Sequence, residues 1–299
     1  MNAALCAKEV YLKRYKVFNF DFDGRAEILN QEISDSWEQD VRVNWLENKQ
    51  KVKEGLISEF GSINCFQKIQ DFSDLGSDQP SLIAFHNKFM KQVSYSYSLG
   101  SYYPALTGAC SLGERILNHL VLKLRGYFKD TPEYQKVYRK KSFDNWDLAI
   151  NTLEAWDVLL PEAAEKFREL KTIRNKSIHF NPEVDENYKE SALQAILKLK
   201  QIIRTQFSGF GSQPWYIDGT KGACFVRKSF EDNPFVVEVV LPNCYKVGHL
   251  HKLESARGGW KIIDEHEYAN VEVSDEHFKE LINNPTKYDA ANNLIELGT

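Results

Sequence analysis

The sequence predicts a mainly α-helical protein with a four-helix bundle at its centre and a small antiparallel α+β region at its C-terminal end. Apolar residues between positions 101 and 207 recur three or four apart in four successive segments, which is the spacing of amphipathic helices. The segment Ser208–Pro214 (SGFGSQP) has the composition of a linker. We therefore expect a mostly helical region with a short strand over residues 1–100, the bundle over 101–207 and the α+β region over 213–299.

The N-terminal region is predicted to contain one strand and two helices. Phenylalanines alternate with polar residues over 17–23, and Gly24 marks a turn after them, so this segment favours a half-buried strand. Helical spacing follows at two sets of apolar residues: Ile33, Trp37, Val41 and Trp45, and then Leu82, Phe85, Phe89 and Val93. His86 lies beside the second set, and we expect it to be a core histidine with satisfied hydrogen bonds.

The bundle is predicted to have four helices, which cover residues 104–128, 146–160, 161–180 and 193–203. Pro104 and Pro161 suit the first turn of a helix, and Asn181-Pro182 stops the third helix. Four amphipathic helices with short connections make a bundle.

The C-terminal region is predicted to form a small antiparallel sheet followed by one helix. Its candidate strands are the runs 223–226, 235–241 and 260–263, which are apolar or alternate in polarity. The final helix is expected over Ser274–Asn283, with Ser274 as its N-cap. The capping box is incomplete because His277 stands where Glu or Gln would complete it.

Composition limits the classes of function. The chain has 299 residues and a formal net charge of −4, so a nucleic-acid site would have to be a local feature. Its five cysteines are scattered without a CxxC pair, which predicts reduced thiols in a cytoplasm. No stretch approaches the roughly 18 apolar residues of a membrane helix, so we expect a cytoplasmic protein with no membrane partner.

The third helix of the bundle carries a charge on its apolar face. Arg174 follows Phe167 and Leu170 at helical spacing, and a buried charge costs several kcal/mol unless it is paired. Glu114 lies at the edge of the first helix's apolar stripe and is the candidate partner. A structural ion pair is the alternative interpretation of these two residues.

His179 follows Arg174 by five positions at the end of the same helix. Five helical residues advance about 7.5 Å and turn about 140° beyond a full revolution, so one copy places the two side chains on different sides of the helix. A twofold groove between two copies could use both residues from each chain.

The segment Arg174-Asn175-Lys176-Ser177-Ile178-His179 resembles the R-polar-x-x-x-H motif of the HEPN superfamily, placed at the end of the third helix of a bundle. The segment Tyr103-Pro104-Ala105-Leu106, leading to Glu114-Arg115, is similar to that family's opening helix and its acidic position. The resemblance covers residues 101–207 and implies a HEPN-like bundle that acts as a homodimer. It further implies a toxin or antiviral-defence effector with an antitoxin or regulatory protein as its partner.

The resemblance implies cleavage of RNA without a metal or any other cofactor. The 2'-hydroxyl attacks the adjacent phosphorus and leaves 2',3'-cyclic phosphate and 5'-hydroxyl ends. His179 would transfer protons, and Arg174 would bind the charge that builds on the phosphoryl oxygens. Asn175 would contact phosphate or orient His179, and Glu114 would orient Arg174.

A basic connection is the candidate surface for RNA. Arg139, Lys140 and Lys141 are interleaved with aromatic residues, a combination that can follow a nucleic-acid backbone and stack bases, and Lys176 adds a cation beside Arg174. A solvated basic loop is the alternative interpretation of this segment.

Two other patterns have structural explanations that compete with a functional one. Asp21-Phe22-Asp23-Gly24 resembles the DxD loop of haloacid-dehalogenase phosphatases, but the helical chain after it argues against a doubly wound fold and favours a strand ending in an acidic turn. His249-Leu250-His251, near Cys244, would need further metal ligands and is otherwise a polar strand face. The alternatives to a nuclease are a HEPN-like module that binds RNA, a nucleotide or a protein without catalysis, and a dimerisation scaffold.

Overall fold

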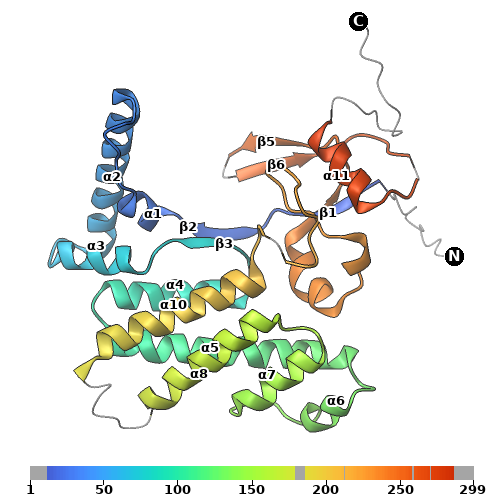
Figure 1. The fold of residues 1–299 in the computed structure, drawn as a ribbon, viewed down its shortest axis with the longest axis horizontal. Coiled ribbons are helices and arrows are strands. Elements are labelled where there is room, and N and C mark those ends of the chain that lie inside the picture. The colour runs from blue at the N-terminus through green and yellow to red at the C-terminus, as the bar shows by residue number, and fades with distance from the viewer. Residues whose placement is uncertain (1–11, 179–185, 212, 258, 270, 286–299) are drawn as a thin grey trace, which may run out of the picture. The chain divides into compact units, whose positions relative to one another are not determined.

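The computed structural model describes residues 12–178, 186–211, 213–257, 259–269 and 271–285. Two compact units divide the chain: the larger unit is Phe20–Ser208, and the smaller unit combines Met1–Asn19 with Gly209–Thr299. The described residues are mainly helical, with three short two-stranded antiparallel sheets, which confirms the expected mainly α class (Figure 1). The boundary at Ser208 falls in the predicted linker, whereas residue 100 lies inside the larger unit.

The larger unit is built around α5 (Tyr102–Leu124). Four other helices pack against it: α4 (Phe85–Ser98), α7 (Trp146–Ala155), α8 (Pro161–Ile178) and α10 (Tyr188–Phe207) (Figure 1). Leu106 and Leu117 are buried on α5 as the predicted stripe requires, but Leu112 and Ile116 are buried as well. Because α5 is apolar on more than one side, α4 joins the four helices expected from the sequence.

Gly113 allows α5 to approach its neighbours closely. A Cβ atom added at Gly113 would lie 2.7 Å from Leu170 Cδ2 of α8 and 2.8 Å from Trp146 Cη2 of α7, closer than real Cβ contacts allow. The absence of a side chain therefore brings α7 and α8 against α5 beside Glu114.

Two helices of the bundle are shorter than predicted. The second helix ends at Ala155 and not at Leu160, because Asp157 takes the left-handed conformation with φ 52° and breaks the helical backbone. The first ends at Leu124 and continues as the 3₁₀ turn η1 (Arg125–Tyr127). The connection that follows contains a further helix, α6 (Pro132–Val137), capped by Thr131.

The single strand predicted over 17–23 is two strands in two units. β1 (Arg14–Val17) pairs with β4 (Cys244–Val247) in the smaller unit, and β2 (Phe20–Asp23) pairs with β3 (Asp78–Leu82) in the larger one. The amides of Phe18 and Asn19 both donate to the Asn243 carbonyl, which interrupts the strand between them. Leu82 accordingly ends a strand and does not start a helix.

The helix predicted from Ile33 begins later. α1 (Arg25–Asn30) is followed by a turn in which Ser34 Oγ accepts from the Ser36 amide at 3.2 Å. α2 (Gln39–Phe60) starts after this turn, because such side-chain bonds compete with helix formation, and α3 (Cys65–Asp74) follows. Ile33 and Trp37 therefore precede the helix in which they were predicted.

The smaller unit has a compact apolar core in which Leu12, Phe225, Val247 and Phe278 are buried. β5 (Lys252–Ala256) pairs with β6 (Gly259–Ile263), which confirms the strand predicted at 260–263. The helix α11 (Asp275–Asn283) confirms the last prediction of that region: Ser274 Oγ caps it by accepting from the His277 amide at 3.1 Å.

Two of the predicted C-terminal strands differ in the structure. The strand predicted over 235–241 is wrong, since η3 (Val236–Val240) is a π-helical segment. Asn233 Oδ1 accepts from the Phe235 and Val236 amides, and this cap starts a helix in spite of the β-branched residues. The run 223–226 forms only isolated bridges, from Phe225 and Val226.

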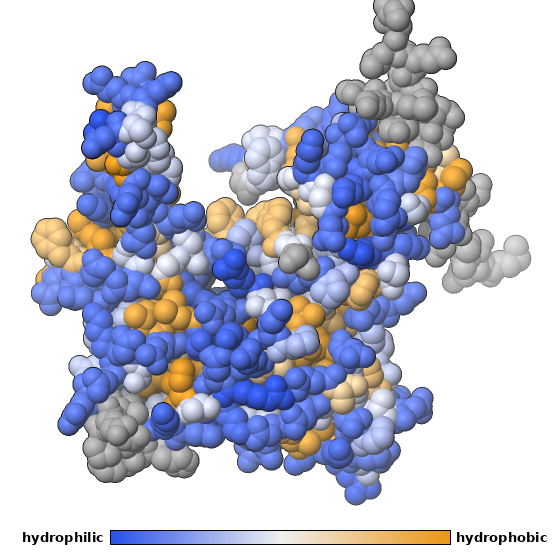
Figure 2. Space-filling view, viewed as in Figure 1, coloured by the Kyte–Doolittle hydropathy of each residue, from blue (hydrophilic) through white to orange (hydrophobic). Residues whose placement is uncertain are grey.

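The surface is mixed in polarity. Figure 2 shows hydrophobic side chains around α3, whereas the α2 column is mostly hydrophilic. Leu46, Ile63 and Phe66 are exposed. Across the ranges that the structure describes, no helix combines the length and the apolar character needed to cross a bilayer. Cys65, Cys110, Cys224 and Cys244 are free thiols, as expected from their scattered positions.

Candidate functional site

Three side chains from three helices meet at the predicted charge pair. Arg174 Nη2 on α8 donates to Glu114 Oε2 on α5 at 3.3 Å, which confirms Glu114 as the partner of Arg174. Trp146 Nε1 on α7 donates to the same oxygen at 3.1 Å. The sequence prediction missed Trp146, although a buried indole N–H requires an acceptor and Glu114 is a carboxylate beside the apolar stripe of α5.

The pair lies at the rim of the core. The Arg174 and Glu114 side chains are 25% and 34% exposed, while Trp146 is buried. Arg174 follows the buried Leu170 by one turn of α8, and its guanidinium is held by Glu114 yet reaches solvent. Such a group can bind an anion without first becoming ordered.

The other described residues of the motif are close to this pair. Arg174 Nη1 donates to Asn175 Oδ1 at 3.3 Å, and both Asn175 and Lys176 are exposed. His179 and the Asn181-Pro182 stop lie outside the described residues. The structure therefore brings together Arg174, Glu114 and Asn175 of the predicted site.

The Cys110 thiol, one turn before Glu114, is not a nucleophile at neutral pH. Burial raises the pKa of Cys110 to about 11, against smaller lowering effects of Ser177 and Arg174. A thiol with this pKa stays protonated near pH 7, and only the thiolate is a strong nucleophile. The chemistry of this site would therefore depend on Arg174 and on groups near it.

Arg174 is also the last of a series of interhelical ion pairs on α8. Arg168 contacts Glu154 of α7, with Nη1 3.2 Å from Oε1, and Lys171 contacts Asp147 of α7. These pairs stand at three-residue spacing, so Arg174 shares its geometry with residues that hold helices together. A substitution at Arg168 or Lys171 therefore serves as a structural control for a substitution at Arg174.

The predicted RNA-binding segment is exposed and lies some distance from Arg174. Arg139, Lys140 and Lys141 are all exposed, and Arg125 Nη1 donates to the Lys140 carbonyl at 2.7 Å. Arg125 follows Glu114 by eleven residues, a span of about 16 Å along a helix. The two sets of basic residues are therefore separate on the bundle.

The other sequence patterns lack the geometry that their chemistry needs. Within the described ranges, no three or more His, Cys, Asp or Glu residues form a group that could hold a metal ion. In the His249-Leu250-His251 pattern, His251 Nε2 lies 2.8 Å from Lys16 Nζ, so this nitrogen contacts a lysine and not a further metal ligand. Asp21 and Asp23 belong to a two-stranded antiparallel ribbon and are paired with Lys91 and Arg25, so the phosphatase-like loop is not set in a doubly wound sheet.

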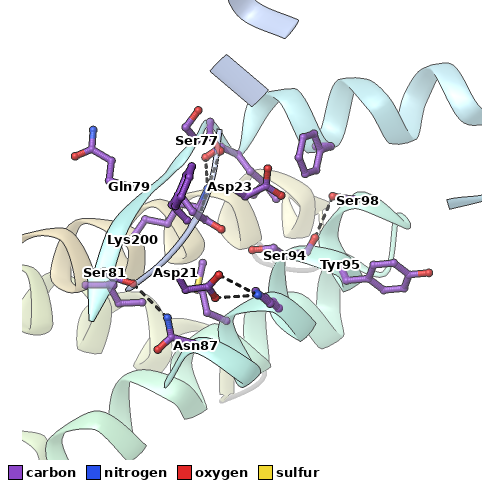
Figure 3. Close-up of a pocket in the computed structure, with 18 of the residues that line it drawn as sticks. Asp21, Asp23, Ser77, Gln79, Ser81, Asn87, Ser94, Tyr95, Ser98 and Lys200 are labelled. Carbon is purple, nitrogen blue, oxygen red and sulfur yellow. Dashed lines mark hydrogen bonds and ion pairs between the residues drawn. The ribbon is translucent and has the colours of Figure 1, made fainter. Parts of the chain in front are cut away.

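A cavity of about 940 Å³ lies elsewhere in the larger unit, between the β2–β3 ribbon, α4 and α10. Figure 3 shows Asp21 and Asp23 of β2 around it, with Ser94 and Ser98 on the neighbouring helix α4. The sequence prediction missed this cavity because its walls come from segments far apart in the chain, and the acidic turn is the one local pattern among them.

His86 lines this cavity and corrects the expectation of a satisfied core histidine. The side chain is fully buried against the ring of Phe207, but neither ring nitrogen has a hydrogen-bond partner among the described residues. Burial lowers the pKa of His86 to about 4, and the charge of Asp21 opposes this only in part. The imidazole is therefore neutral at pH 7 and presents one donor and one acceptor.

Acid is expected to destabilise the larger unit through His86. An unfolded chain binds a proton at this histidine near pH 6.5, whereas the folded chain does so only near pH 4. Between these values the unfolded state holds more protons, so stability falls by about 3 kcal/mol as the pH is lowered from 7 to 4. Urea unfolding of wild type and His86→Phe at both pH values measures this, and an equal pH dependence of the two proteins would contradict it.

The comparisons with known proteins supply no family for this geometry. No family model matches the sequence, and neither a curated protein nor a solved structure matches it.

Proposed function

We propose that this protein is a metal-independent endoribonuclease of the HEPN type, with Arg174 and His179 as catalytic residues. The observation that carries the proposal is the partly exposed guanidinium of Arg174 on α8, which Glu114 of α5 holds in place. Arg174 lies five residues before His179 in the sequence. On this proposal, α5, α7, α8 and α10 correspond to the four helices of a HEPN bundle.

The pairing of Arg174 supports a role in binding phosphate. Among the described residues the guanidinium contacts Glu114 and Asn175, which leaves further N–H groups for phosphoryl oxygens. Glu114 also accepts from Trp146, so the carboxylate is itself held in place. A preorganised cation stabilises the charge that develops in the transition state without reorganising during the reaction.

The proposed reaction needs a proton-transfer group beside this cation. The 2'-hydroxyl loses a proton as it attacks phosphorus, and the leaving 5'-oxygen gains one. An imidazole that titrates near neutrality can perform either transfer, which is the role proposed for His179. On a continuous α-helix, five residues turn about 140° beyond a full revolution, so in this proposal a second copy of the chain completes each site in a homodimer.

Purified protein is expected to cleave RNA in the presence of EDTA. The fragments should carry 5'-hydroxyl groups, which polynucleotide kinase labels without prior dephosphorylation, and 2',3'-cyclic phosphates, which block 3' ligation until they are opened and removed. These ends follow from 2'-hydroxyl attack with no metal-bound water. Activity that disappears on chelation and returns with a divalent metal would contradict the mechanism.

A non-catalytic RNA-binding module is the second candidate, and the ion-pair series on α8 favours it. Arg168, Lys171 and Arg174 each join α8 to a neighbouring helix, so Arg174 could have a structural role alone. Such a module would bind RNA through Arg139, Lys140 and Lys141 and leave it intact. Both candidate functions are compatible with a protein partner, whether an antitoxin or a regulatory protein.

A further inference from the structure

The cavity between the β2–β3 ribbon, α4 and α10 has one wall made by a single helix face. His86, Met90, Ser94 and Ser98 follow one another four residues apart on α4, and all four line the cavity. Figure 3 shows Ser94 and Ser98 in this position on α4. A volume of about 940 Å³ is large enough for a small organic molecule.

Two side chains on this wall have buried polar atoms that lack a hydrogen-bond partner among the described residues. Both ring nitrogens of His86 and the hydroxyl of Ser94 make no hydrogen bond to any described residue. A buried polar group without a partner is costly, and native proteins usually satisfy it with protein, water or a ligand. These atoms therefore mark where a bound molecule would donate and accept hydrogen bonds.

The charges of the cavity largely cancel one another. Three of its basic side chains form ion pairs within the lining, at nitrogen–oxygen distances of 2.8 Å for Lys91–Asp21, 2.7 Å for Arg25–Asp23 and 2.8 Å for Lys200–Asp78. Lys200 Nζ also donates to the carbonyls of Leu75 and Gly76. A ligand that brings a net charge would have to disrupt these pairs, so the lining favours an uncharged ligand.

The remaining lining supplies aromatic faces and neutral polar groups. Phe22, Phe60 and Phe72 contribute rings, and Phe22 is 59% exposed and therefore open to stacking. Ser77, Gln79 and Gln201 contribute hydroxyl and amide groups of the kind that bind sugar hydroxyls.

We infer that this cavity binds an uncharged nucleoside, with the edge of the base hydrogen-bonded to His86 and the ribose among the neutral hydroxyl and amide side chains. A heteroaromatic base has donors and acceptors on neighbouring atoms, which match an imidazole that offers one of each. This binding site is separate from Arg174 and does not depend on the proposed nuclease activity.

Equilibrium dialysis of the full-length protein with adenosine, guanosine, cytidine and uridine tests the inference. At least one nucleoside is expected to bind. Its 5'-monophosphate is expected to bind about tenfold more weakly, because the phosphate adds a net charge to a lining in which Lys91 and Arg25 are already paired with Asp21 and Asp23. Binding of none of the four nucleosides overturns the inference. A monophosphate that binds more tightly than its nucleoside overturns the inference that the lining favours an uncharged ligand.

Two matched histidine variants assign the binding to His86. His86→Phe keeps an aromatic ring but removes both nitrogens, and since these make no bond to described residues the variant is expected to fold. It should bind the nucleoside at least about tenfold more weakly. His119→Phe is the control, because His119 stacks on Phe85 and does not line the cavity. Equal affinity of wild type and His86→Phe overturns the assignment, whether or not the protein cleaves RNA.

Discussion

Arg174→Ala is expected to reduce RNA cleavage by roughly 10²–10³-fold, and His179→Ala by roughly 10²–10⁴-fold. The first variant removes the cation that faces the phosphoryl oxygens, and the second removes the proton-transfer group. Neither should unfold the protein, because the Arg174–Glu114 pair is partly exposed and an exposed pair contributes about 1 kcal/mol at most. Initial rates on a labelled RNA, measured in EDTA, give the comparison.

Arg168→Ala is the matched control for Arg174→Ala. Arg168 lies on the same helix, pairs with Glu154 of α7 and is more exposed than Arg174. Its loss removes an interhelical ion pair of the same kind without touching the motif. We therefore expect Arg168→Ala to cleave RNA at the wild-type rate.

Three outcomes would contradict the assignment of Arg174 and His179. Equal losses of activity in Arg174→Ala and Arg168→Ala would show that Arg174 acts only by holding α8 in place. Cleavage that survives His179→Ala would exclude this imidazole as the proton-transfer group. RNA binding without cleavage in the wild type, retained in both variants, would establish the non-catalytic module.

Arg174→Lys separates charge from geometry at the same position. Lysine keeps the positive charge but cannot make the bidentate contact of a guanidinium with phosphate. If the planar group is needed, Arg174→Lys resembles Arg174→Ala in rate and resembles wild type in RNA affinity.

The sequence was sufficient to predict the Arg174–Glu114 pair because Arg174 interrupts one apolar stripe and Glu114 lies at the edge of another. A charge on a buried face requires an opposite charge on the facing helix, and Glu114 is an acidic residue beside the apolar face of α5. Trp146 was missed because a tryptophan on an apolar stripe is explained by burial alone. Only the structure shows that its N–H completes the contacts of Glu114.

The division of the N-terminal strand could not be predicted from local periodicity. The alternation of Phe18, Phe20 and Phe22 is continuous, but the partners of the two halves, β4 and β3, lie in different units of the chain. The strand over 235–241 failed for the opposite reason: a cap from Asn233 outweighed a β-branched sequence. Strand assignment depends on tertiary partners that short-range patterns do not contain.

The cavity could not be predicted because no single segment carries its chemistry. Its polar points lie on α4, its ion pairs join the β2–β3 ribbon to α1, α4 and α10, and its rings come from β2 and from the ends of α2 and α3. Each residue has an ordinary explanation in its own segment. The unpartnered nitrogens of His86 become visible only when the helix is packed.

Trp146→Ala is expected to lower the free energy of unfolding of the larger unit by about 3–5 kcal/mol. The indole is 1% exposed and packs against Phe167, with ring centroids 6.4 Å apart, and against the backbone of Gly113. Because Gly113 has no side chain to move into the space, the cavity left by alanine stays open, which adds to the lost burial.

Trp146→Phe distinguishes packing from the hydrogen bond to Glu114. Phenylalanine retains most of the ring volume, so the loss of unfolding free energy should be clearly smaller than for alanine, while Glu114 loses the donor that fixes it. If Glu114 positions Arg174 for catalysis, Trp146→Phe therefore lowers the rate of RNA cleavage by more than its small loss of unfolding free energy would explain. Urea unfolding followed by circular dichroism gives the free energies, and the EDTA cleavage assay gives the rates.

A Trp146→Ala protein with an unfolding free energy within about 1 kcal/mol of wild type would contradict the packing of α7 on α5, since large-to-small changes at well-packed core sites cost several times more.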